Sequence, residues 1–469
     1  MENVTQTVVD FAMETGFDDL PDEVKQESKR VLLDSLGCAL AGIATDKGRY
    51  AIRLAKKLGG PPESTIIGIG DKVSSGNAAF ANGELINALD MDAILSPPGH
   101  ISPYVIPACL ALAESEWASG KDLILAIALA HEISIRIAAA LTRMYSTDSE
   151  GKLTVSDVFG FDSSILGGII GCGKILELDR EKMLHAMGIA AYSTPIPAFI
   201  KWGMTPPAAM TKYTSTGWVS LAEVMAALLA EMGYTGDTAV LDGDYGFWKM
   251  FASDKWEPNS ITEKLGKEWQ FLEISYKPYP CCRAMHGALD SFIEIMKENN
   301  LTPQDIESVR VLAHPLLDMP LWRNVEIATH IDAQFSVPYT FAVAAYGINL
   351  GADWQDPRVM KDPRILDFMK KVSHGLHPDW GKARLQDPRS MLSLVEVTAK
   401  GQTFKKEKTW AKGDPSPEEG KMKDEELEAK FRSNASKILD EHKIEEAVKT
   451  VFELEKAEDI SELLEYLSL

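Results

Sequence analysis

The sequence predicts a mainly α fold: a large all-helical domain built from both ends of the chain, with a smaller inserted α/β lid domain. Three observations predict it. Residues 1–268 fall mostly into Ala-, Gly- and Leu-rich segments of helical length, several of them apolar on nearly all sides, as in a helix bundle. Strand-like and helical segments alternate over residues 269–404. Helical periodicity returns over residues 405–469, and we expect these helices to rejoin the first domain.

The first domain is expected to contain one short strand or extended link, over residues 64–69, and a series of helices. The helices are predicted over residues 4–13, 21–43, 51–58, 77–89, 105–113, 121–142, 164–176, 180–193 and 211–231. The small residues Ala41 and Gly42 permit close packing at the end of the second helix. Pro107 suits the first turn of its helix, because the missing N–H would be unpaired there anyway.

The middle of the chain changes in character near Trp269. Strands are predicted over residues 271–276, 306–313 and 392–400, and helices over residues 284–299, 335–346 and 364–372. The last part of the chain is predicted to form helices over residues 424–437, 444–452 and 460–467. This order places the α/β segment between two helical parts.

Composition narrows the class of protein. Hydrophobic residues make up 45% and charged residues 25% of the 469-residue chain, as in ordinary globular proteins. The formal net charge of −21 argues against nucleic acid or an anionic membrane as a partner, whereas a small acidic substrate responds to the local field of a cleft. Five cysteines do not form a disulfide framework in so long a chain, and their spacing does not match the usual zinc motifs. We expect a cytoplasmic protein, because the N-terminus lacks a signal-peptide layout and no run of 18 apolar residues occurs.

Titratable residues gather between two helices that are apolar enough to be buried. Asp90 and Asp92 end one helix, and His100 follows the Pro97-Pro98-Gly99 break that precedes the next. Such groups on a loop held by rigid elements are typical of catalytic or binding sites. The alternative is that the two acids and Ser96 only solvate a turn.

This stretch resembles the signature of the MmgE/PrpD family in its Asn82-Gly83 pair, Asp90, Asp92, His100 and the run from Pro107 to Glu114. It departs from the family pattern at Asn87, Ala93 and Ile94, where the family usually has His, Asp, and Thr or Ser. Further matches follow in order along nearly the whole chain, at residues 34–38, 277–286, 334–339 and 424–431. The resemblance implies the helical domain with its lid, and a homodimer.

The family includes dehydratases, decarboxylases and epimerases, so the resemblance does not fix the reaction. These reactions form or quench a carbanion-like centre beside a carboxylate, and the resemblance implies no metal and no cofactor. The protein must then supply cations for the substrate carboxylates and an acid and a base with a suitable pKa. The expected partner is therefore a small carboxylate.

The resemblance assigns roles to the two segments. Lys277, Arg283 and His286 would hold carboxylates, since a guanidinium fork and a helix N-terminus both favour them. Lys277 and His286 are also expected to be catalytic. His100 would act as acid or base, with Asp90 or Asp92 orienting it. Arg283 could instead form a structural salt bridge and His286 could be a satisfied structural histidine. Cys281, placed at the substrate, could act as a nucleophile, although no expected step requires one.

Two further departures suggest a substrate unlike citrate. Residues 158–164 contain no histidine where the decarboxylase branch has one, and Pro206 stands where that branch has a lysine. Lys201 or Lys212 could replace this lysine from another direction. We expect Lys201, Ile94 and Trp202 to contact the substrate, with Phe161 and Phe199 in an apolar pocket, although these aromatic residues could equally be ordinary core.

We therefore predict a cofactor-independent lyase, a dehydratase or decarboxylase, that acts on a small carboxylic acid. An epimerase or isomerase is the second hypothesis, because it needs only removal and return of a proton. A binding protein without activity is the third, since family residues are missing. The lyase hypothesis requires Asp90, Asp92 and His100 to meet Lys277, Arg283 and His286 across one solvent-shielded gap.

Overall fold

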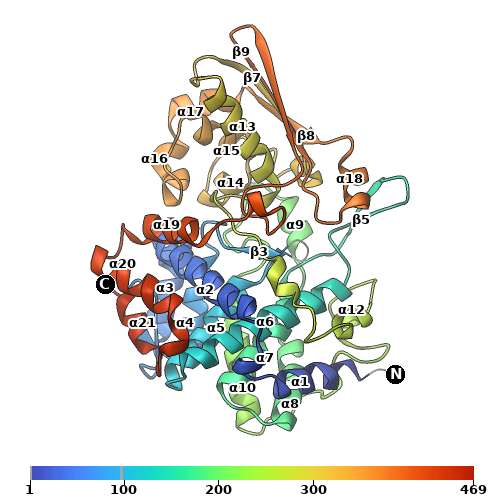
Figure 1. The fold of residues 1–469 in the computed structure, drawn as a ribbon, viewed down its shortest axis with the longest axis vertical. Helices are drawn as coiled ribbons and strands as arrows, with labels where there is room; N and C mark the ends of the chain where they lie inside the picture. The colour runs from blue at the N-terminus through green and yellow to red at the C-terminus, as the bar shows by residue number, and fades with distance from the viewer. Residues whose placement is uncertain (1–2, 96–98) are drawn as a thin grey trace.

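Helices dominate the computed structural model, which describes residues 3–95 and 99–469, so the fold is mainly α as predicted (Figure 1). Most helices lie in one half of the molecule, and a four-stranded sheet with its own helices forms the other half (Figure 1). Pro97 and Pro98, predicted to break the chain before His100, lie outside the described residues. The division into domains at residues 268 and 404 stays a prediction.

The helices predicted for the first 268 residues occur in the predicted order, and short helices over residues 199–203, 247–250 and 259–262 were not predicted. Together these helices are α1 (Val4–Glu14), α2 (Asp22–Gly42), α3 (Asp46–Leu58), α4 (Ser75–Ile86), α5 (Ser102–Ser115), α6 (Gly120–Ala140), α7 (Ile165–Ile175), α8 (Arg180–Tyr192), α9 (Phe199–Gly203), α10 (Thr216–Glu231), α11 (Phe247–Met250) and α12 (Asn259–Thr262). Three two-stranded ribbons join them: β1 (Ser64–Thr65) with β2 (Lys72–Val73), β3 (Ile94–Leu95) with β4 (Gly99–His100), and β5 (Tyr145–Thr147) with β6 (Leu153–Val155).

Close packing at the end of α2 is confirmed. A Cβ atom on Gly42 would lie 2.2 Å from the carbonyl oxygen of Leu85 in α4, so only glycine fits there. This contact fixes α4 against α2. Because α4 leads directly into Asp90, the packing also fixes where the candidate site begins.

The prediction that Pro107 occupies a first turn is wrong, because α5 begins five residues earlier, at Ser102. Pro103 takes the early position instead. Pro107 cannot donate a hydrogen bond within the helix, and Ser220 of α10 approaches the backbone there. Its hydroxyl donates to the carbonyl oxygen of Tyr104 at 2.6 Å and lies 3.4 Å from that of Pro103.

Helix α6 is, in the described part of the chain, the one helix long and apolar enough to cross a membrane by length and composition. In the folded chain 89% of its apolar window is buried. It packs on α7 and α5, which is how a core helix of a bundle lies.

The sheet has the strand order β10-β9-β7-β8. Its strands are β7 (Ile306–Ala313), β8 (Val372–Leu376), β9 (Ser393–Ala399) and β10 (Gln402–Lys408), with β7 and β8 parallel and the other neighbours antiparallel. The helices of this half are α13 (His286–Glu298), α14 (His330–Phe335), α15 (Val337–Ala345), α16 (Pro357–Met360), α17 (Pro363–Met369) and α18 (Trp380–Gln386). Helix α13 packs on β9 and β10, and its buried apolar residues belong to the same continuous core as those of the helical half.

One strand prediction for this half is wrong, and two strands were missed. Residues 271–276 form a 3-10 turn over Gln270–Glu273 and then a single antiparallel bridge between Ser275 and Ile94, because only two backbone bonds, of 2.7 and 2.9 Å, are made there. Strands β8 and β10 were not predicted. Strand β10 reads QTFKKEK, and such charged, lysine-rich patterns are typical of a sheet edge exposed to water.

The C-terminal helices α19 (Asp424–Ala435), α20 (Glu441–Phe452) and α21 (Ser461–Tyr466) lie beside the first helices of the chain (Figure 1). Helix α19 packs on α2, and Lys430 links the two through an ion pair of 2.6 Å to Asp34. The same ammonium donates to the carbonyl oxygen of Met91 at 2.7 Å. The last part of the chain therefore supports the backbone between Asp90 and Asp92.

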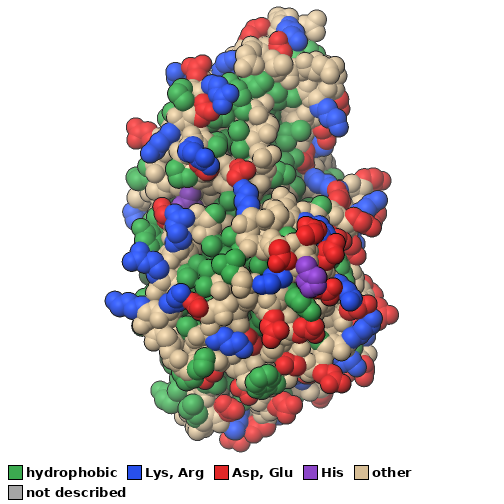
Figure 2. All heavy atoms as spheres, turned by 90° about the vertical axis from the view of Figure 1, so that its left-hand side faces the viewer, with side chains coloured by type: hydrophobic (Ala, Val, Ile, Leu, Met, Phe, Trp, Pro, Cys, Tyr) green, Lys and Arg blue, Asp and Glu red, His purple; other side chains and the backbone are tan. Residues whose placement is uncertain are grey.

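The surface reflects the net charge of −21. On the face drawn in Figure 2, acidic side chains gather over the helical half, while Lys and Arg are spread over the whole face. A positively charged cleft on this protein therefore stands out against an acidic background.

Candidate active site

The candidate site begins where the chain leaves α4. Asp90 has a left-handed backbone with φ of 56°, which is uncommon outside glycine and tolerated best by Asp and Asn. Two ammonium groups hold this turn: Lys277 donates to the carbonyl oxygen of Asp90 at 2.9 Å, and Lys212 to that of Asn87 at 3.0 Å. The left-handed turn places the Asp90 carboxylate within hydrogen-bonding distance of both lysines.

The Asp90 carboxylate binds both lysines. Lys212 Nζ lies 2.6 Å from one oxygen and Lys277 Nζ lies 2.8 Å from the other, and all three side chains are buried. Burial alone would raise the pKa of Asp90, but the charges of Lys212 and Lys277 outweigh it and hold the pKa well below its usual value. Asp90 is therefore a carboxylate at neutral pH.

The two lysines differ in their pKa although they share one carboxylate. Burial lowers the pKa of Lys212 to about 8, and the charges of Asp90 and Asp92 offset this only in part. For Lys277 burial also lowers the pKa, but Asp90 and Asp92 reverse the shift and raise it above the usual value. Both lysines are thus cationic at neutral pH, and Lys277 is the more firmly charged.

His100 and Asp92 form a hydrogen-bonded pair. His100 Nδ1 lies 2.5 Å from Asp92 Oδ2, and Asn87 donates to the other oxygen of Asp92 at 3.0 Å. Burial lowers the pKa of His100, although the charge of Asp92 opposes this, so the ring is neutral at pH 7. A neutral ring that donates from Nδ1 leaves Nε2 as a proton acceptor. That atom faces the cavity side, 3.7 Å from an Asp90 oxygen.

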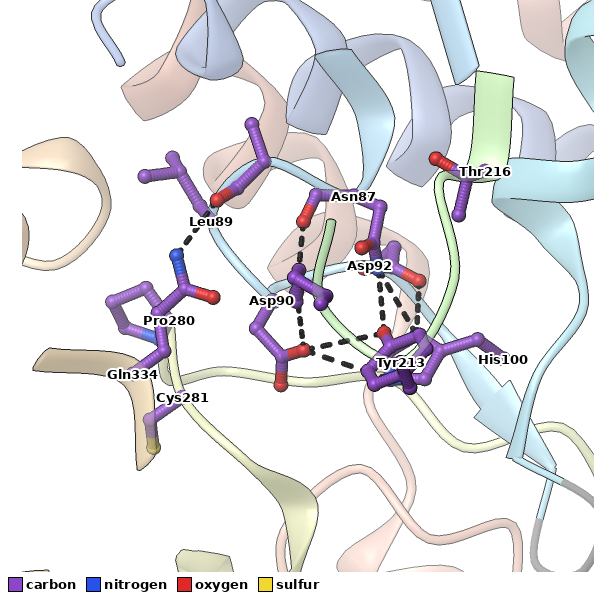
Figure 3. Close-up of polar contacts among 12 residues, drawn as sticks. Asn87, Leu89, Asp90, Asp92, His100, Tyr213, Thr216, Pro280, Cys281 and Gln334 are labelled. Carbon is purple, nitrogen blue, oxygen red and sulfur yellow. Dashed lines mark hydrogen bonds and ion pairs between the residues drawn. The ribbon is translucent and has the colours of Figure 1, made fainter. Parts of the chain in front are cut away.

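Aromatic side chains fix the plane of the His100 ring. Tyr213 stacks on it with ring centres 5.1 Å apart, and Phe161 meets it edge-on at 5.6 Å. Asn87 donates to the Tyr213 hydroxyl at 2.8 Å, which ties this ring to the same network (Figure 3). A Cβ on Gly99, whose φ is 125°, would lie 2.2 Å from Phe161, so glycine is required for the ring to reach His100.

These groups face a cavity of about 100 Å³. Its polar wall carries Asp90, His100, Tyr145, Tyr213, Lys277, Cys282, Arg283 and His314. Its apolar wall includes Ile94, Leu95, Met144, Phe159, Phe161, Phe199, Leu316, Phe335 and Met391. Ligand pockets usually measure roughly 300–1,000 Å³, so this cavity in its present form suits a small ligand with an apolar part.

The structure brings some of the predicted site residues together. Asp90, Asp92, His100 and Lys277 lie in one network, as the lyase hypothesis requires, and Ile94 lines the cavity beside them. The alternative that the acids only solvate a turn is wrong, since Asp90 and Asp92 are 1% and 0% exposed.

Three other predicted site residues are placed differently: Arg283, His286 and Cys281. Arg283 lines the cavity, but its guanidinium binds Asp414 at 2.6 Å and the carbonyl oxygen of Lys412 at 2.8 Å, so the structural salt bridge also exists. His286 and Cys281 are buried against each other, 3.6 Å apart, and neither belongs to the cavity wall; Figure 3 shows Cys281 apart from His100. Burial and then the charge of Arg283 lower the pKa of His286 well below its usual value, as for a structural histidine.

The predicted substrate contacts of Trp202 and Lys201 need correction. Trp202 is buried behind the cavity wall, with its ring 4.7 Å from that of Phe335 and 5.9 Å from that of Phe199. The exposed Lys201 bonds to Thr205 at 3.1 Å and does not line the cavity, because α9 turns it toward solvent. Of the two lysines considered, Lys212 is the one that reaches Asp90.

Tyr145 and His314 line the cavity and were not predicted. They come from segments far apart in the chain, and no motif marks either one. Asn87 was noted only as a departure from the family pattern, although it holds Asp92 and Tyr213. Across residues 3–95 and 99–469, no group of three or more His, Cys, Asp and Glu side chains is placed to hold a metal ion.

The helical fold and the buried network, with its histidine base and its two lysine cations, define one class of protein. Sequence comparison identifies that class. The model of the MmgE/PrpD N-terminal domain matches residues 6–259, and that of the MmgE/PrpD C-terminal domain matches residues 279–454. The chain belongs to the MmgE/PrpD family.

Its relatives include proteins named cis-aconitate decarboxylase. One from Aspergillus terreus is 25% identical over 99% of this chain and 96% of its own length. One from Homo sapiens is 28% identical over 95% of this chain and 90% of its own length. A cis-aconitate decarboxylase-like protein, oryM, from Aspergillus oryzae is 24% identical over 99% of this chain and 97% of its own length.

Proposed function

We propose that this protein is a cofactor-independent lyase that acts on a small carboxylic acid. Family membership and the relatives named cis-aconitate decarboxylase support a lyase-type role. The observation that carries the proposal is the neutral His100, held by Asp92 beside the cationic Lys277 in one shielded cavity, with an Nε2 that has no hydrogen-bond partner among residues 3–95 and 99–469. A base and a cation in this arrangement suit chemistry on a carbon next to a carboxylate.

Lys277 has the role of binding the substrate carboxylate and the charge that develops on it. The ammonium is buried and its position is fixed by Asp90, so little reorganisation is needed when the charge grows. His100 Nε2 takes the proton from the neighbouring carbon, and Asp92 stabilises the imidazolium that forms. In a dehydration the electron pair of the broken C–H bond forms the double bond, and the leaving hydroxide takes the proton from the His100 imidazolium, which yields water and the neutral ring.

The state of His100 and the names of the relatives support different lyase reactions. A neutral histidine favours a first step of proton removal, as in loss of water. A decarboxylation instead breaks a C–C bond, leaves the electron pair on carbon and needs a proton donor afterwards. The names of the relatives support this second reaction. Product analysis separates the two.

The cavity supports a substrate less charged than a tricarboxylate. Phe159 and Phe161 occupy the segment in which the decarboxylase branch has a histidine, and both line the apolar wall. Lys277 and Arg283 are the cations of the wall, and each already has a carboxylate partner. A monoacid or an alkyl-substituted diacid fits this balance better than citrate does.

A panel of acids tests the function. We would incubate the protein with 2-methylcitrate, cis-aconitate, amino-succinates, and alkyl-succinates that carry either a hydroxyl group, which can leave as water, or a carbon–carbon double bond, which can take the electron pair of a decarboxylation. Products are detected by mass spectrometry. The expected result is loss of water or carbon dioxide from an alkyl-substituted acid, with none in a His100→Gln blank. A panel with turnover only on a tricarboxylate would refute the proposed substrate class, and no product from any acid would favour the binding-protein hypothesis.

An epimerase is the second candidate, because removal and return of a proton need only His100 and the carboxylate cation. Incubation of the same acids in D₂O tests it. Deuterium in the recovered acid without a new product supports an epimerase, whereas deuterium that appears only alongside product supports the lyase.

The homodimer implied by the family resemblance remains a proposal. Helix α10 exposes Trp218 and Met225, and Met232 directly after the helix is also exposed, so we place a second copy of the chain on this face. Light scattering should give twice the mass of the chain, and Met225→Asp should shift it toward one. A monomeric wild type would refute the proposal.

A further inference from the structure

A second, larger cleft lies next to the catalytic cavity. It measures about 590 Å³ and lies between the β5–β6 ribbon, helix α18 and the loop that carries Asp254. The side chain of Tyr145 lines both the cleft and the cavity. The two spaces are thus neighbours, with one aromatic residue at their boundary.

The cleft is basic, although the protein as a whole is strongly acidic. Arg143, Lys255 and Arg384 line it, against one acid, Asp254. Lys255 pairs with Glu257 at 2.9 Å, outside the cleft wall. Among the residues that the structure describes, neither Arg143 nor Arg384 takes part in an ion pair. Two arginines without carboxylate partners face a space large enough for a ligand.

Arg384 is held in place rather than freely solvated. Its guanidinium lies over the ring of Trp380, 5.3 Å from the ring centre, and the side chain is half-buried. Burial lowers the pKa of Arg384, and Arg143 lowers it further while Tyr145 and Asp387 oppose this. Across the described residues, Asp254 forms no ion pair with either arginine, and its carboxylate accepts a hydrogen bond from Thr142. An incoming anion would relieve the repulsion between the arginines.

Tyr145, at the boundary between the cleft and the cavity, has a hydroxyl group that can donate a hydrogen bond to a ligand. The backbone N–H of Leu316 donates to His314 Nδ1 at 3.2 Å, and burial lowers the pKa of His314 to about 3, so the ring is neutral and protonated at Nε2. That Nε2–H donates to the Tyr145 hydroxyl oxygen at 2.5 Å. The O–H of Tyr145 is therefore left to donate elsewhere, to a group in the cleft or in the cavity.

We propose that this cleft is a capture site for small carboxylates, in which Arg143 and Arg384 bind the anion before it passes Tyr145 into the catalytic cavity. The last part rests on the proposed function, whereas the anion binding does not. Paired arginine forks match carboxylate oxygens, and a basic cleft in low-dielectric walls raises the local concentration of an anion that the rest of the surface repels. Tyr145 donates to the carboxylate as it leaves the arginines.

The experiment compares two double variants with the same loss of charge. Arg143→Met with Arg384→Met removes the cleft arginines, and Arg310→Met with Arg358→Met removes two exposed arginines that pair with Glu396 and Asp356. Titration calorimetry measures the binding of succinate, with uncharged succinamide as the control ligand. We expect the double variant without the cleft arginines to bind succinate at least about tenfold more weakly than wild type. The control double variant should bind succinate as wild type does. Succinamide should bind to none of the three proteins.

Equal succinate binding by both double variants, or none by wild type, would overturn the capture site. The entrance role has its own readout once a substrate is known: kcat/KM should fall in the cleft variant with kcat unchanged, and its dependence on salt should weaken. An unchanged kcat/KM would overturn that role. If no acid is turned over but the arginines bind succinate, the proposed function fails while the anion site stands.

Discussion

Asp90 and Asp162 are two buried aspartates near the same cavity, and their pKa values are shifted in opposite directions. Asp90 meets two lysines, which hold its pKa well below the usual value despite burial. Asp162 meets only the hydroxyl of Thr214, and burial raises its pKa to about 7. One oxygen of Asp162 has no hydrogen-bond partner among the described residues. The difference shows that burial raises the pKa of an acid, and that at Asp90 the two lysines, which arrive from distant segments, reverse this shift.

The largest effect is expected from Asp90→Asn. This change leaves Lys212 and Lys277 as buried ammonium groups without a carboxylate, and losing one partner of a buried pair costs about 3–5 kcal/mol. Urea unfolding followed by circular dichroism measures it. The matched control is Asp353→Asn, which loses a solvent-exposed pair with Lys437 and should cost about 0–1 kcal/mol. Equal losses would contradict the Asp90 centre.

His100→Gln is expected to lower kcat/KM by about 10²–10⁴, because it removes the proton acceptor of the cavity. The comparison is His286→Gln, which changes a histidine predicted to be catalytic but buried against Cys281 outside the cavity wall. We expect His286→Gln to lower kcat/KM by less than about tenfold while it destabilises the fold by about 1–3 kcal/mol. A larger catalytic loss for His286→Gln would reverse this division of roles.

Asp162→Asn tests whether burial raises the pKa of Asp162 in the folded protein. The folded state holds the Asp162 proton up to about pH 7, whereas the unfolded chain releases it above about 3.8, so wild-type stability falls as pH rises between these values. The asparagine of the variant cannot ionise, so the variant should not lose this stability. Between pH 4 and pH 7 the free energy of unfolding of wild type should fall by roughly 2–4 kcal/mol more than that of the variant. Urea unfolding at both pH values measures the difference. Parallel pH curves for wild type and variant would show that Asp162 is ionised when folded.

The smallest effect is expected from Lys201→Met. Its ammonium is exposed and bonds only to Thr205, so stability should change by less than about 0.5 kcal/mol and kcat/KM should stay at the wild-type value. Lys212→Met, in contrast, removes one of the two cations at Asp90 and should lower both. A loss of activity with Lys201→Met would restore the predicted substrate contact.

Much of the helical part could be predicted because helical periodicity is local. The helices α4 to α8 lie within a few residues of their predicted ranges, and the loop with Asp90 and His100 was found from spacing and resemblance. Strand β10 was missed because its charged pattern is also typical of a solvated loop. Tyr145 and His314 carried no signal, since each reaches the cavity through contacts made outside its own segment.

The sequence by itself determined the family, the mainly α class and the residues able to carry charge near Asp90. Only the tertiary structure decided which of these residues meet. Lys277 turns toward Asp90 while His286, nine positions along, turns to Cys281, and Lys212 rather than Lys201 completes the network. The physical reason is that a buried ionic group is stable only beside its counter-charge. Which counter-charge lies within reach depends on how segments far apart in the chain pack together.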